Sequence, residues 1–386
     1  MFKAEELFQN VTDKNHPDET VLTIIQGKGT LPREQAGRNI HYDDASLSNY
    51  KKVEQGDFII HLRSFEGGLE MANEAGIVSQ AYTILRCKRP HSSLFYDAYF
   101  HTDEFINHNL SKSVEGIRDG RQISYEAFKW LGIPYCEPTE QEQISSLFSV
   151  LNERIAKQRN LVESLKKYKR GLSNSLFDRL SAGSESRLCI FGDMMTILQN
   201  NTFSRDNLSV AGNGVRNIHY GDVLIKYGAV LDLHSENVTV INAEQDISKF
   251  SALSYLRNGD VVFADTAEDY TVGKSTEIIG AENIAALSGL HTIPCRPQDF
   301  FAPMYLGYYF NSDYFKKQLY PMIQGTKVSS ISKSEIIKTK IIVPCLQEQA
   351  RIASIMSALD DRIDAAKHTT KDLIDLRSGL LQQLFI

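Results

Sequence analysis

The stretch EQEQISSLFSVLNERIAKQRNLVESLKKYKRGLSNSLF at 140–177 recurs at 348–385 as EQARIASIMSALDDRIDAAKHTTKDLIDLRSGLLQQLF. The offset is a constant 208 positions without a gap, and 13 of the 38 aligned pairs are identical. An internal repeat of this length predicts that the chain is built twice on one plan, with each copy at the same place in its half.

Each copy is predicted to be one long helix, because neither contains proline and both are rich in Leu, Lys, Glu, Gln and Arg. Apolar residues recur at seven-residue spacing for about five heptads, which favours a coiled coil. Two helices in one chain, separated by a folded domain, most simply pair antiparallel. The alternative is two separate surface helices. The residues expected in the helix-pair seam are Ile144, Leu151, Leu165, Leu172, Ile352, Leu359, Leu373 and Leu380, with Gln158 and Ala366 completing the two series.

A second series, three residues further along, is expected to fill the intermediate seam positions. Its members are Leu147, Leu161 and Tyr168 in the first copy and Ile355, Thr369 and Leu376 in the second. At about 1.5 Å per residue, 38 residues make a helix of roughly 57 Å.

Length and composition indicate a folded chain of 386 residues with room for two domains. No apolar run reaches the length of a membrane span, and the first ten residues lack the apolar core of a signal peptide. The five cysteines form no C-x-x-C pair, which is typical of reduced thiols in a cytoplasmic protein. The net charge of −6 argues against a general polyanion binder.

The repeat divides the chain into domain, helix, domain, helix. Residues 1–139 form a mixed α and β domain with 15 Lys and Arg against 20 Asp and Glu, and 140–180 form the first long helix. A short linker around 181–184 leads to a second domain at 186–343, and 344–386 form the second long helix. The expected fold class is α+β, with two similar α/β domains separated by two long helices that pack as an antiparallel coiled coil with pseudo-two-fold symmetry.

The two domains share short echoes at different offsets, so their loops differ in length. Arg38-Asn39-Ile40-His41-Tyr42 recurs at 216–220, and Tyr99-Phe100-His101-Thr102-Asp103 resembles 309–313. A glycine-bearing basic segment follows each, at 120–124 and at 325–329, and we align these two segments from their glycines. A strand-like lead equivalent to 187–197 is weak before Glu6, so the first domain is expected to start short or divergent.

Motifs for bond-making chemistry are missing. There is no Pro-Pro for a base-flipping methyltransferase loop, and no H-E-x-x-H or Cys/His zinc spacing. Gly273-Lys274-Ser275 lacks the upstream glycine of a phosphate loop, since Glu268 stands there. We therefore expect no catalytic residue, metal or cofactor in this chain.

The motifs E-Q-x-x-I, L-[ND]-[ED]-R-I and G-L-x-x-x-L-F in both copies, with a domain before each, resemble the specificity subunit (HsdS) of type I restriction–modification systems. The resemblance covers the entire chain. It implies a non-catalytic subunit whose two target recognition domains each read half of a bipartite double-stranded DNA target, held apart by the helices. It also implies two modification (methyltransferase) subunits and translocating restriction subunits as partners, with S-adenosylmethionine, ATP and Mg on those partners.

Base reading needs Arg or Lys for guanine, Asn or Gln for adenine, and Ser or Thr for either. Such residues gather in the glycine-bearing segments and beside two other glycine turns. The DNA-binding candidates are Arg63, Arg118, Arg121, Gln122, Ser124, Lys226, Lys327, Ser329 and Ser330.

The acidity of both domains predicts weak DNA binding by the chain alone, because phosphate contacts supply much of the affinity for DNA. Docking of modification subunits is expected on exposed helix faces that include Arg154, Arg159 and Arg362. The alternatives are a coiled-coil scaffold that carries two binding domains and has no role on DNA, and a stand-alone enzyme that cuts or methylates DNA.

Overall fold

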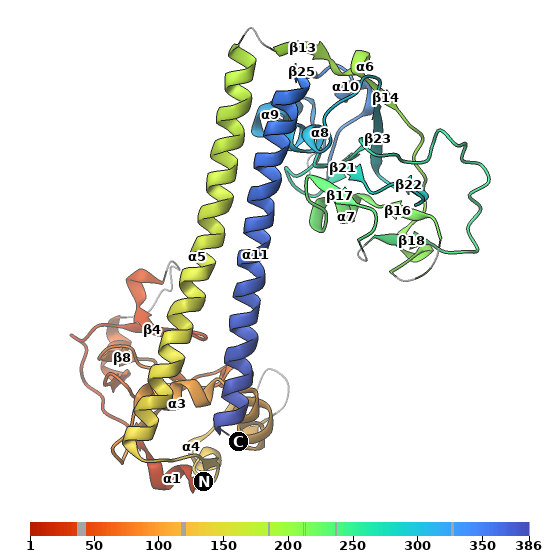
Figure 1. The fold of residues 1–386 in the computed structure, drawn as a ribbon. Coiled ribbons are helices and arrows are strands. Elements are labelled where there is room, and N and C mark those ends of the chain that lie inside the picture. Colours follow the sequence, from red (N-terminus) through yellow and green to blue (C-terminus); the bar gives the residue numbers. More distant parts are fainter. Residues whose placement is uncertain are drawn as a thin grey trace. The chain divides into compact units, whose positions relative to one another are not determined.

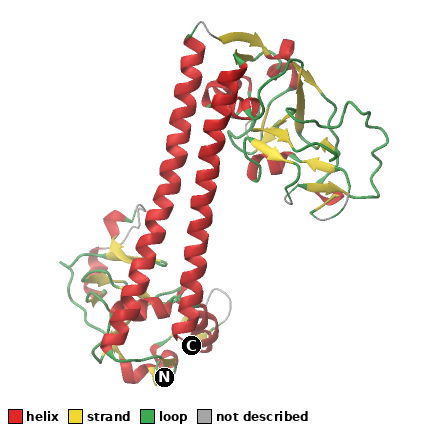
Figure 2. Ribbon diagram, in the orientation of Figure 1, coloured by secondary structure: helices red, strands yellow, loops and turns green. Residues whose placement is uncertain are grey.

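The computed structural model describes residues 1–36, 44–116, 121–183, 186–210, 212, 214–235, 238–325 and 328–385. The chain divides into two compact units (Figure 1). Unit 1 comprises Met1–Asn160 and Lys367–Ile386, and unit 2 comprises Leu161–Ala366. Both mix helix and strand (Figure 2), so the α+β class is confirmed. No helix among the described residues is both long and apolar enough to cross a bilayer.

The main sheet of unit 1 has four strands in the order β2-β9-β6-β7, paired antiparallel throughout. Three two-stranded ribbons, β1 with β12, β3 with β4 and β5 with β8, and the hairpin β10–β11 complete the unit. The strands are β1 (Phe2–Lys3), β2 (Phe8–Val11), β3 (Leu22–Ile25), β4 (Gly29–Pro32), β5 (Lys51–Val53), β6 (Phe58–Ile60), β7 (Glu70–Met71), β8 (Gly76–Val78), β9 (Thr83–Cys87), β10 (Val114–Glu115), β11 (Gln122–Ile123) and β12 (Gly132–Ile133). The short helices are α1 (Ala4–Leu7), α2 (Ser64–Gly67), α3 (Ser93–Phe100) and α4 (Tyr125–Phe128).

The main sheet of unit 2 has the order β14-β23-β19-β21-β17, and a second sheet has the order β15-β18-β16-β22. The strands are β13 (Ser186–Ile190), β14 (Met195–Ile197), β15 (Leu208–Ser209), β16 (Arg216–Ile218), β17 (Val230–Asp232), β18 (Thr239–Ile241), β19 (Val261–Ala264), β20 (Thr266–Ala267), β21 (Ser275–Ile279), β22 (Ala286–Ser288), β23 (Thr292–Pro297), β24 (Ser329–Ser330) and β25 (Lys340–Pro344). The short helices are α6 (Phe191–Met194), α7 (Tyr220–Ile225), α8 (Tyr305–Phe310), α9 (Asp313–Leu319) and α10 (Lys333–Ile336).

The first four strands of each main sheet correspond one to one. In unit 1, β6 lies between β9 and β7, as β19 lies between β23 and β21 in unit 2. The entry to each sheet corresponds too: β1, α1 and β2 match β13, α6 and β14. The lead expected to be weak before Glu6 is therefore present, but β1 has two residues where β13 has five. The duplication extends from the helices to the domains.

Two long helices complete the fold, α5 (Pro138–Ala182) and α11 (Leu346–Phe385). Their halves lie side by side within each unit (Figure 1). In unit 2, Lys169 pairs with Asp360 and Arg179 with Glu348, so residue numbers rise along α5 as they fall along α11. The helices are therefore antiparallel.

The residues of the seven-residue series differ in burial, and none of them is fully exposed. Leu151, Ile352 and Leu373 are buried, whereas Ile144, Leu165, Leu172, Leu359 and Leu380 are half-buried.

The intermediate series predicted three residues further along is wrong. Leu147, Leu161 and Tyr168 are 41%, 42% and 60% exposed, Leu376 is 51% exposed, Thr369 is exposed and Ile355 is half-buried. The seam continues at four residues instead, through Phe148, Ile155, Val162 and Leu176 in α5 and Met356 and Ile363 in α11. A seam alternates steps of three and four, and the three-residue choice would have required Arg154 inside it.

Each long helix is fixed to its neighbouring domain by the glutamine of the E-Q-x-x-I motif. Gln141 accepts a hydrogen bond from Ser92 N (3.0 Å) and donates one to Cys136 O (2.8 Å). Gln349 accepts from Ala302 N (2.9 Å) and donates to Pro344 O (2.9 Å). Both glutamines are buried. The motif thus joins the first turn of a long helix to the segment before an aromatic helix, α3 or α8.

The phenylalanine of the G-L-x-x-x-L-F motif makes the second attachment. The Phe385 ring lies 5.0 Å from Phe95 and 5.4 Å from Tyr99, both on α3. The Phe177 ring lies 6.3 Å from Tyr305 and 5.2 Å from Tyr309, both on α8. In each unit, the aromatic helix therefore receives the start of one long helix and the end of the other.

Replacing Gln349 by alanine is expected to destabilise unit 2 by roughly 1–3 kcal/mol, because the Ala302 N–H and the Pro344 carbonyl would lose their partner in a buried site. Urea unfolding monitored by circular dichroism measures the effect. Gln347→Ala is the matched control, since Gln347 is exposed on the same turn of α11. Equal stability of the two variants would contradict this role for Gln349.

A second prediction concerns His101 in unit 1. Its Nε2 lies 3.3 Å from Glu70, and its Nδ1 lies 2.7 Å from the Asp97 carbonyl. Burial lowers the pKa of His101, but Glu70 and Asp97 outweigh burial and raise it above the ordinary value. A raised folded-state pKa stabilises the fold below the ordinary pKa near 6.5, and this stabilisation is lost as pH rises through the folded-state pKa.

His101→Asn should therefore cost more stability at pH 6 than at pH 9. Unit 2 carries Asn311 at the equivalent place, where its amide donates to Ser275 O (2.7 Å). Unfolding of both proteins across this pH range tests the difference, and a constant gap would refute a charged His101.

Candidate nucleic-acid interface

In both units, the segment after the central strand of the main sheet packs against a glycine-bearing segment. In unit 1, α2 follows β6 and contacts β11. In unit 2, β20 follows β19 and pairs with β24, with Thr266 opposite Ser330 and Ala267 opposite Ser329. The sequence candidates therefore gather on corresponding parts of the two units.

In unit 1, the structure brings Arg63 and Arg121 to adjoining elements. Arg63 precedes α2 and is exposed, and the Arg121 guanidinium lies 4.2 Å from the Phe65 ring centre on α2. Gln122 is exposed on β11. A cation held over an aromatic ring keeps hydrogen-bond donors at its edge, a suitable arrangement for guanine or phosphate. Arg118 lies outside the described residues.

Ser124 has a structural task in this region. Its hydroxyl accepts a hydrogen bond from Ala127 N (3.2 Å) and caps α4. In unit 2, Ser332 caps α10 in the same way through Glu335 N (3.3 Å). The sequence-based pairing of Ser124 with Ser329 is therefore wrong.

The corrected alignment pairs Ile123-Ser124 with Ile331-Ser332. The two buried isoleucines and the two caps fix this register. Gly116 and Gly325, at φ 85° and 100°, then become the equivalent glycines. The segments differ by one residue between glycine and isoleucine, so an alignment from Gly120 could not find the register. Ser329 and Ser330 thereby correspond to Arg121 and Gln122.

In unit 2, Lys226 is held by a buried carboxylate. Asp222, 1% exposed, lies 2.9 Å from Lys226 Nζ and accepts two hydrogen bonds from Arg205, at 2.7 and 3.1 Å. Burial raises the pKa of Asp222, but Arg205 and Lys226 outweigh burial and hold it below the usual range. Lys226 is half exposed and, as one of two cations on one carboxylate, keeps positive charge at the surface. Lys327 lies outside the described residues.

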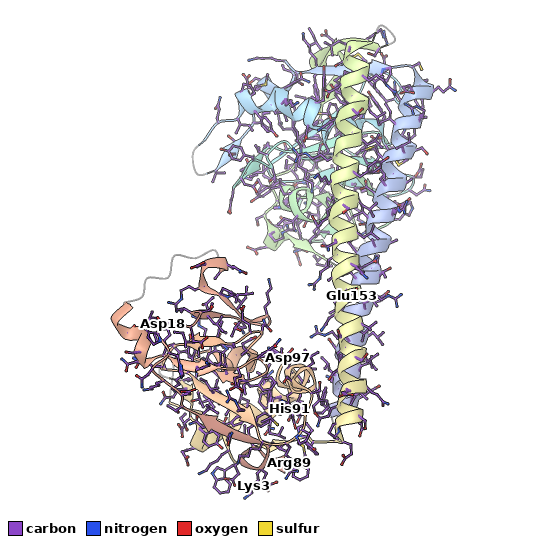
Figure 3. The ribbon with its side chains drawn as sticks, turned by 90° about the vertical axis from the view of Figure 1, so that its left-hand side faces the viewer. Lys3, Asp18, Arg89, His91, Asp97 and Glu153 are labelled. Atoms are coloured by element: carbon purple, nitrogen blue, oxygen red, sulfur yellow. The ribbon has the colours of Figure 1, made fainter. Side chains whose placement is uncertain are left out.

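Sequence reasoning missed a basic and aromatic cluster on unit 1. Lys3 and Lys129 lie 4.4 and 5.4 Å from the ring of Trp130, which is 60% exposed. Arg89 lies 4.6 Å from the Phe2 ring (Lys3 and Arg89 are labelled in Figure 3). The signal available in the sequence was Lys129-Trp130, since this tryptophan is the chain's single one.

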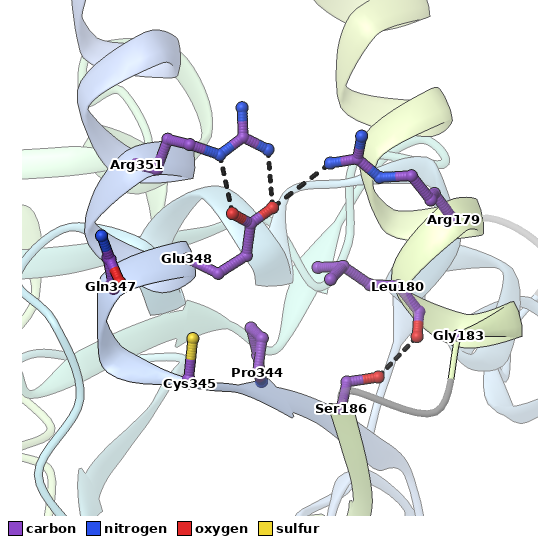
Figure 4. A pocket seen from close by; sticks show the side chains of 9 residues that line it. All are labelled: Arg179, Leu180, Gly183, Ser186, Pro344, Cys345, Gln347, Glu348 and Arg351. Carbon is purple, nitrogen blue, oxygen red and sulfur yellow. Dashed lines mark hydrogen bonds and ion pairs between the residues drawn. The ribbon is translucent and has the colours of Figure 1, made fainter.

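A pocket of about 660 Å³ lies in unit 2 between the end of α5 and the start of α11 (Figure 4). Glu348 accepts hydrogen bonds there from Arg351, at 2.7 and 2.6 Å, and from Arg179, at 3.2 Å. These arginines lower the pKa of Glu348, Arg351 having the larger effect, although burial opposes them. Two guanidiniums share one carboxylate, so the group carries surplus positive charge.

Among the described residues, no group of three or more His, Cys, Asp or Glu side chains is placed to hold a metal ion. The DNA-binding candidates stay predictions, and the structure gives the positions of those among the described residues.

Residues 191–375 match the family model of the type I restriction modification DNA specificity domain. This match includes most of unit 2 and the greater part of α11. Residues 191–375 are therefore similar in sequence to a DNA specificity domain. A comparison with curated protein sequences found no match.

Three solved structures share the fold of the whole chain. The HsdS subunit from Thermoanaerobacter tengcongensis is 19% identical, with a TM-score of 0.52, and the match covers all of this chain and 95% of that one. The type I restriction–modification S subunit from M. genitalium is 15% identical, with a TM-score of 0.55 and the same coverages. A chain from a study of complex assembly and conformational transition of the type I R-M system is 18% identical, with a TM-score of 0.60, and covers 100% and 96%.

The resemblance to type I specificity subunits is thus confirmed by the family model and by the fold.

Arg121→Ala should relax or abolish reading of one half of the DNA target, by about 5- to 150-fold in relative modification rate. Methylation of target variants by the assembled complex measures this effect. Lys28→Ala removes a positive charge from an exposed turn of the same unit and is expected to leave both half-sites unchanged. Equal loss at both halves in Arg121→Ala would assign the residue to folding or phosphate binding.

Proposed function

We propose that the chain is the sequence-reading subunit of a type I restriction–modification complex, with each unit reading one half of a bipartite DNA target. One observation carries the proposal: unit 1 repeats the strand order and helix attachments of unit 2, whose residues match a DNA specificity domain. Two domains of one plan in one chain suit two short base tracts separated by unread sequence. Corresponding faces of a duplex recur about every 34 Å.

The proposed subunit catalyses nothing itself. The sequence carries no motif for methyl transfer, and its nearest approaches to nucleotide-binding motifs lack required glycines. S-adenosylmethionine, ATP and Mg would be held by the modification and restriction subunits.

Exposed helix faces are the proposed docking surfaces for two modification subunits. In unit 1, Leu147 and Val150 of α5 are 41% and 58% exposed, and Arg154 and Arg159 are exposed on the same helix. In unit 2, Leu161 and Tyr168 are exposed on α5. Large apolar side chains gathered at a surface are typical of protein interfaces. The residues that failed as seam positions are therefore well suited to receive a partner helix.

Charged residues also lie on the exposed faces of the long helices. Glu153, labelled in Figure 3, pairs with Lys157 at 2.6 Å on α5, and both are exposed. Arg154 and Arg362 stand at equivalent repeat positions, and both are exposed. Two equivalent arginines would give two identical partners the same contact. The acidic domains would depend on those partners for tight DNA binding.

The decisive test is genome-wide methylation mapping in the host, with the gene deleted and then restored. Loss and return of methylation at one bipartite motif is the expected result. An unchanged methylation pattern would refute the proposal and favour a scaffold without a role on DNA.

Helix length is predicted to set the gap between the half-sites. Four residues inserted after Gln158 and four after the equivalent Ala366 add about 6 Å to each helix. With base pairs about 3.4 Å apart, the preferred gap should lengthen by about one or two base pairs while both half-sites stay the same. Methylation of targets with varied gaps measures it.

The control inserts the same four residues between Ala243 and Glu244, which are both exposed in a turn of unit 2, and should leave the gap unchanged. An unaltered gap in the doubly extended helix variant would show that the helices do not set the spacing.

A further inference from the structure

A turn in unit 2 carries a histidine where glycine would be easier. Residues 289–291 connect β22 to β23, and His291 has φ 54°. Left-handed backbone costs roughly 1–2 kcal/mol for a residue with a Cβ. The ring is nevertheless about half exposed, so burial of the side chain does not repay that cost. An exposed side chain kept at a strained position is a reason to look for a function.

The imidazole of His291 is oriented by its neighbours. Its Nδ1 lies 3.4 Å from Asp265 Oδ1, and the same carboxylate oxygen accepts a hydrogen bond from Thr266 Oγ1 (2.8 Å). The Tyr220 ring meets the imidazole edge-to-face at 5.2 Å. Asp265 N also donates to His291 O (3.1 Å), which ties the turn to the strand. Side chains from two segments, residues 265–266 and Tyr220 of α7, therefore set the direction of this ring.

His291 borders the candidate interface of unit 2. Thr266 begins β20, where it stands opposite Ser330 of β24, and Ile331 N donates to Asp265 O (2.9 Å). Asp265 therefore contacts both the histidine turn and the segment that carries Ser329 and Ser330. In unit 1, the turn before β9 has the sequence Ser-Gln-Ala-Tyr at 79–82, without a histidine. The feature belongs to one unit only, as expected for two units that read different bases.

We propose that His291 is a specificity-determining residue of unit 2 that contacts a base edge through Nε2, an inference that rests on the proposed DNA-reading function. An ionised carboxylate only accepts hydrogen bonds, so Asp265 favours the tautomer with the proton on Nδ1. With the proton on Nδ1, Nε2 carries a lone pair and can accept a hydrogen bond. Its partner in the major groove is an exocyclic amine, N6 of adenine or N4 of cytosine.

The test uses the full chain assembled with its modification subunits. His291→Gly removes the ring and relieves the backbone strain, and is expected to keep or raise the thermal midpoint of unfolding. It should lower methylation of the native target about ten-fold or more and relax one base pair in one half-site. Asn283→Gly is the matched control, because Asn283 also has a positive φ, 63°, in an exposed turn of unit 2. It should leave methylation unchanged.

His291→Asn distinguishes loss of the imidazole from an effect on folding. Asparagine tolerates this backbone conformation, but its side chain is shorter than that of histidine. It should behave like His291→Gly in reading DNA. Native rate and specificity in both His291 variants would overturn this inference while leaving the proposed function intact. If the complex assembled with the wild-type chain methylates no bipartite target, the proposed function itself is refuted.

Discussion

The attachment of each long helix to an aromatic helix is the interaction on which the remaining structure depends. In unit 2, α8 receives Phe177 from the end of α5 and Gln349 from the start of α11, and unit 1 repeats this with Phe385 and Gln141 on α3. Aromatic rings bury large apolar areas. The glutamines add directional hydrogen bonds in sites where an unpaired backbone group would be costly. Together they fix both the position and the rotation of a helix against its domain.

This attachment explains why the motifs of the long helices repeat almost without change while the domains diverge. A glutamine with two buried backbone partners and a phenylalanine between two rings have few replacements. Inside each domain, equivalent positions carry different residues with different hydrogen-bond partners. His101 pairs with Glu70 in unit 1, whereas Asn311 bonds to Ser275 in unit 2. The strand order is kept, and the loops and ribbons around it differ.

The sequence predicted the long helices, their antiparallel pairing and the two-fold plan, because a gapless repeat with seven-residue spacing leaves little choice. The prediction of the second seam series was wrong, because a series placed three residues after Ile144 and one placed four residues after it both fit the seven-residue spacing. Counting the polar residues of each series would have decided the question: Arg154 interrupts one, whereas Phe148, Ile155 and Val162 fill the other. Within the domains, strands of two or three residues carry too short a pattern to predict pairing.

At the candidate interface too, the sequence predicted only part of the arrangement. Composition could select Arg121 and Gln122 as suitable readers, but it could not show that Ser124 is a helix cap or that Ser330 lies opposite Thr266. Those facts depend on register, which one residue of loop length changes. His291 escaped selection because a backbone angle, not a residue pattern, marks it. A scaffold fixed by a few buried contacts, with exposed side chains on short turns, permits replacement of those side chains without refolding the domain. These turn residues are also the part of the chain that sequence patterns describe least.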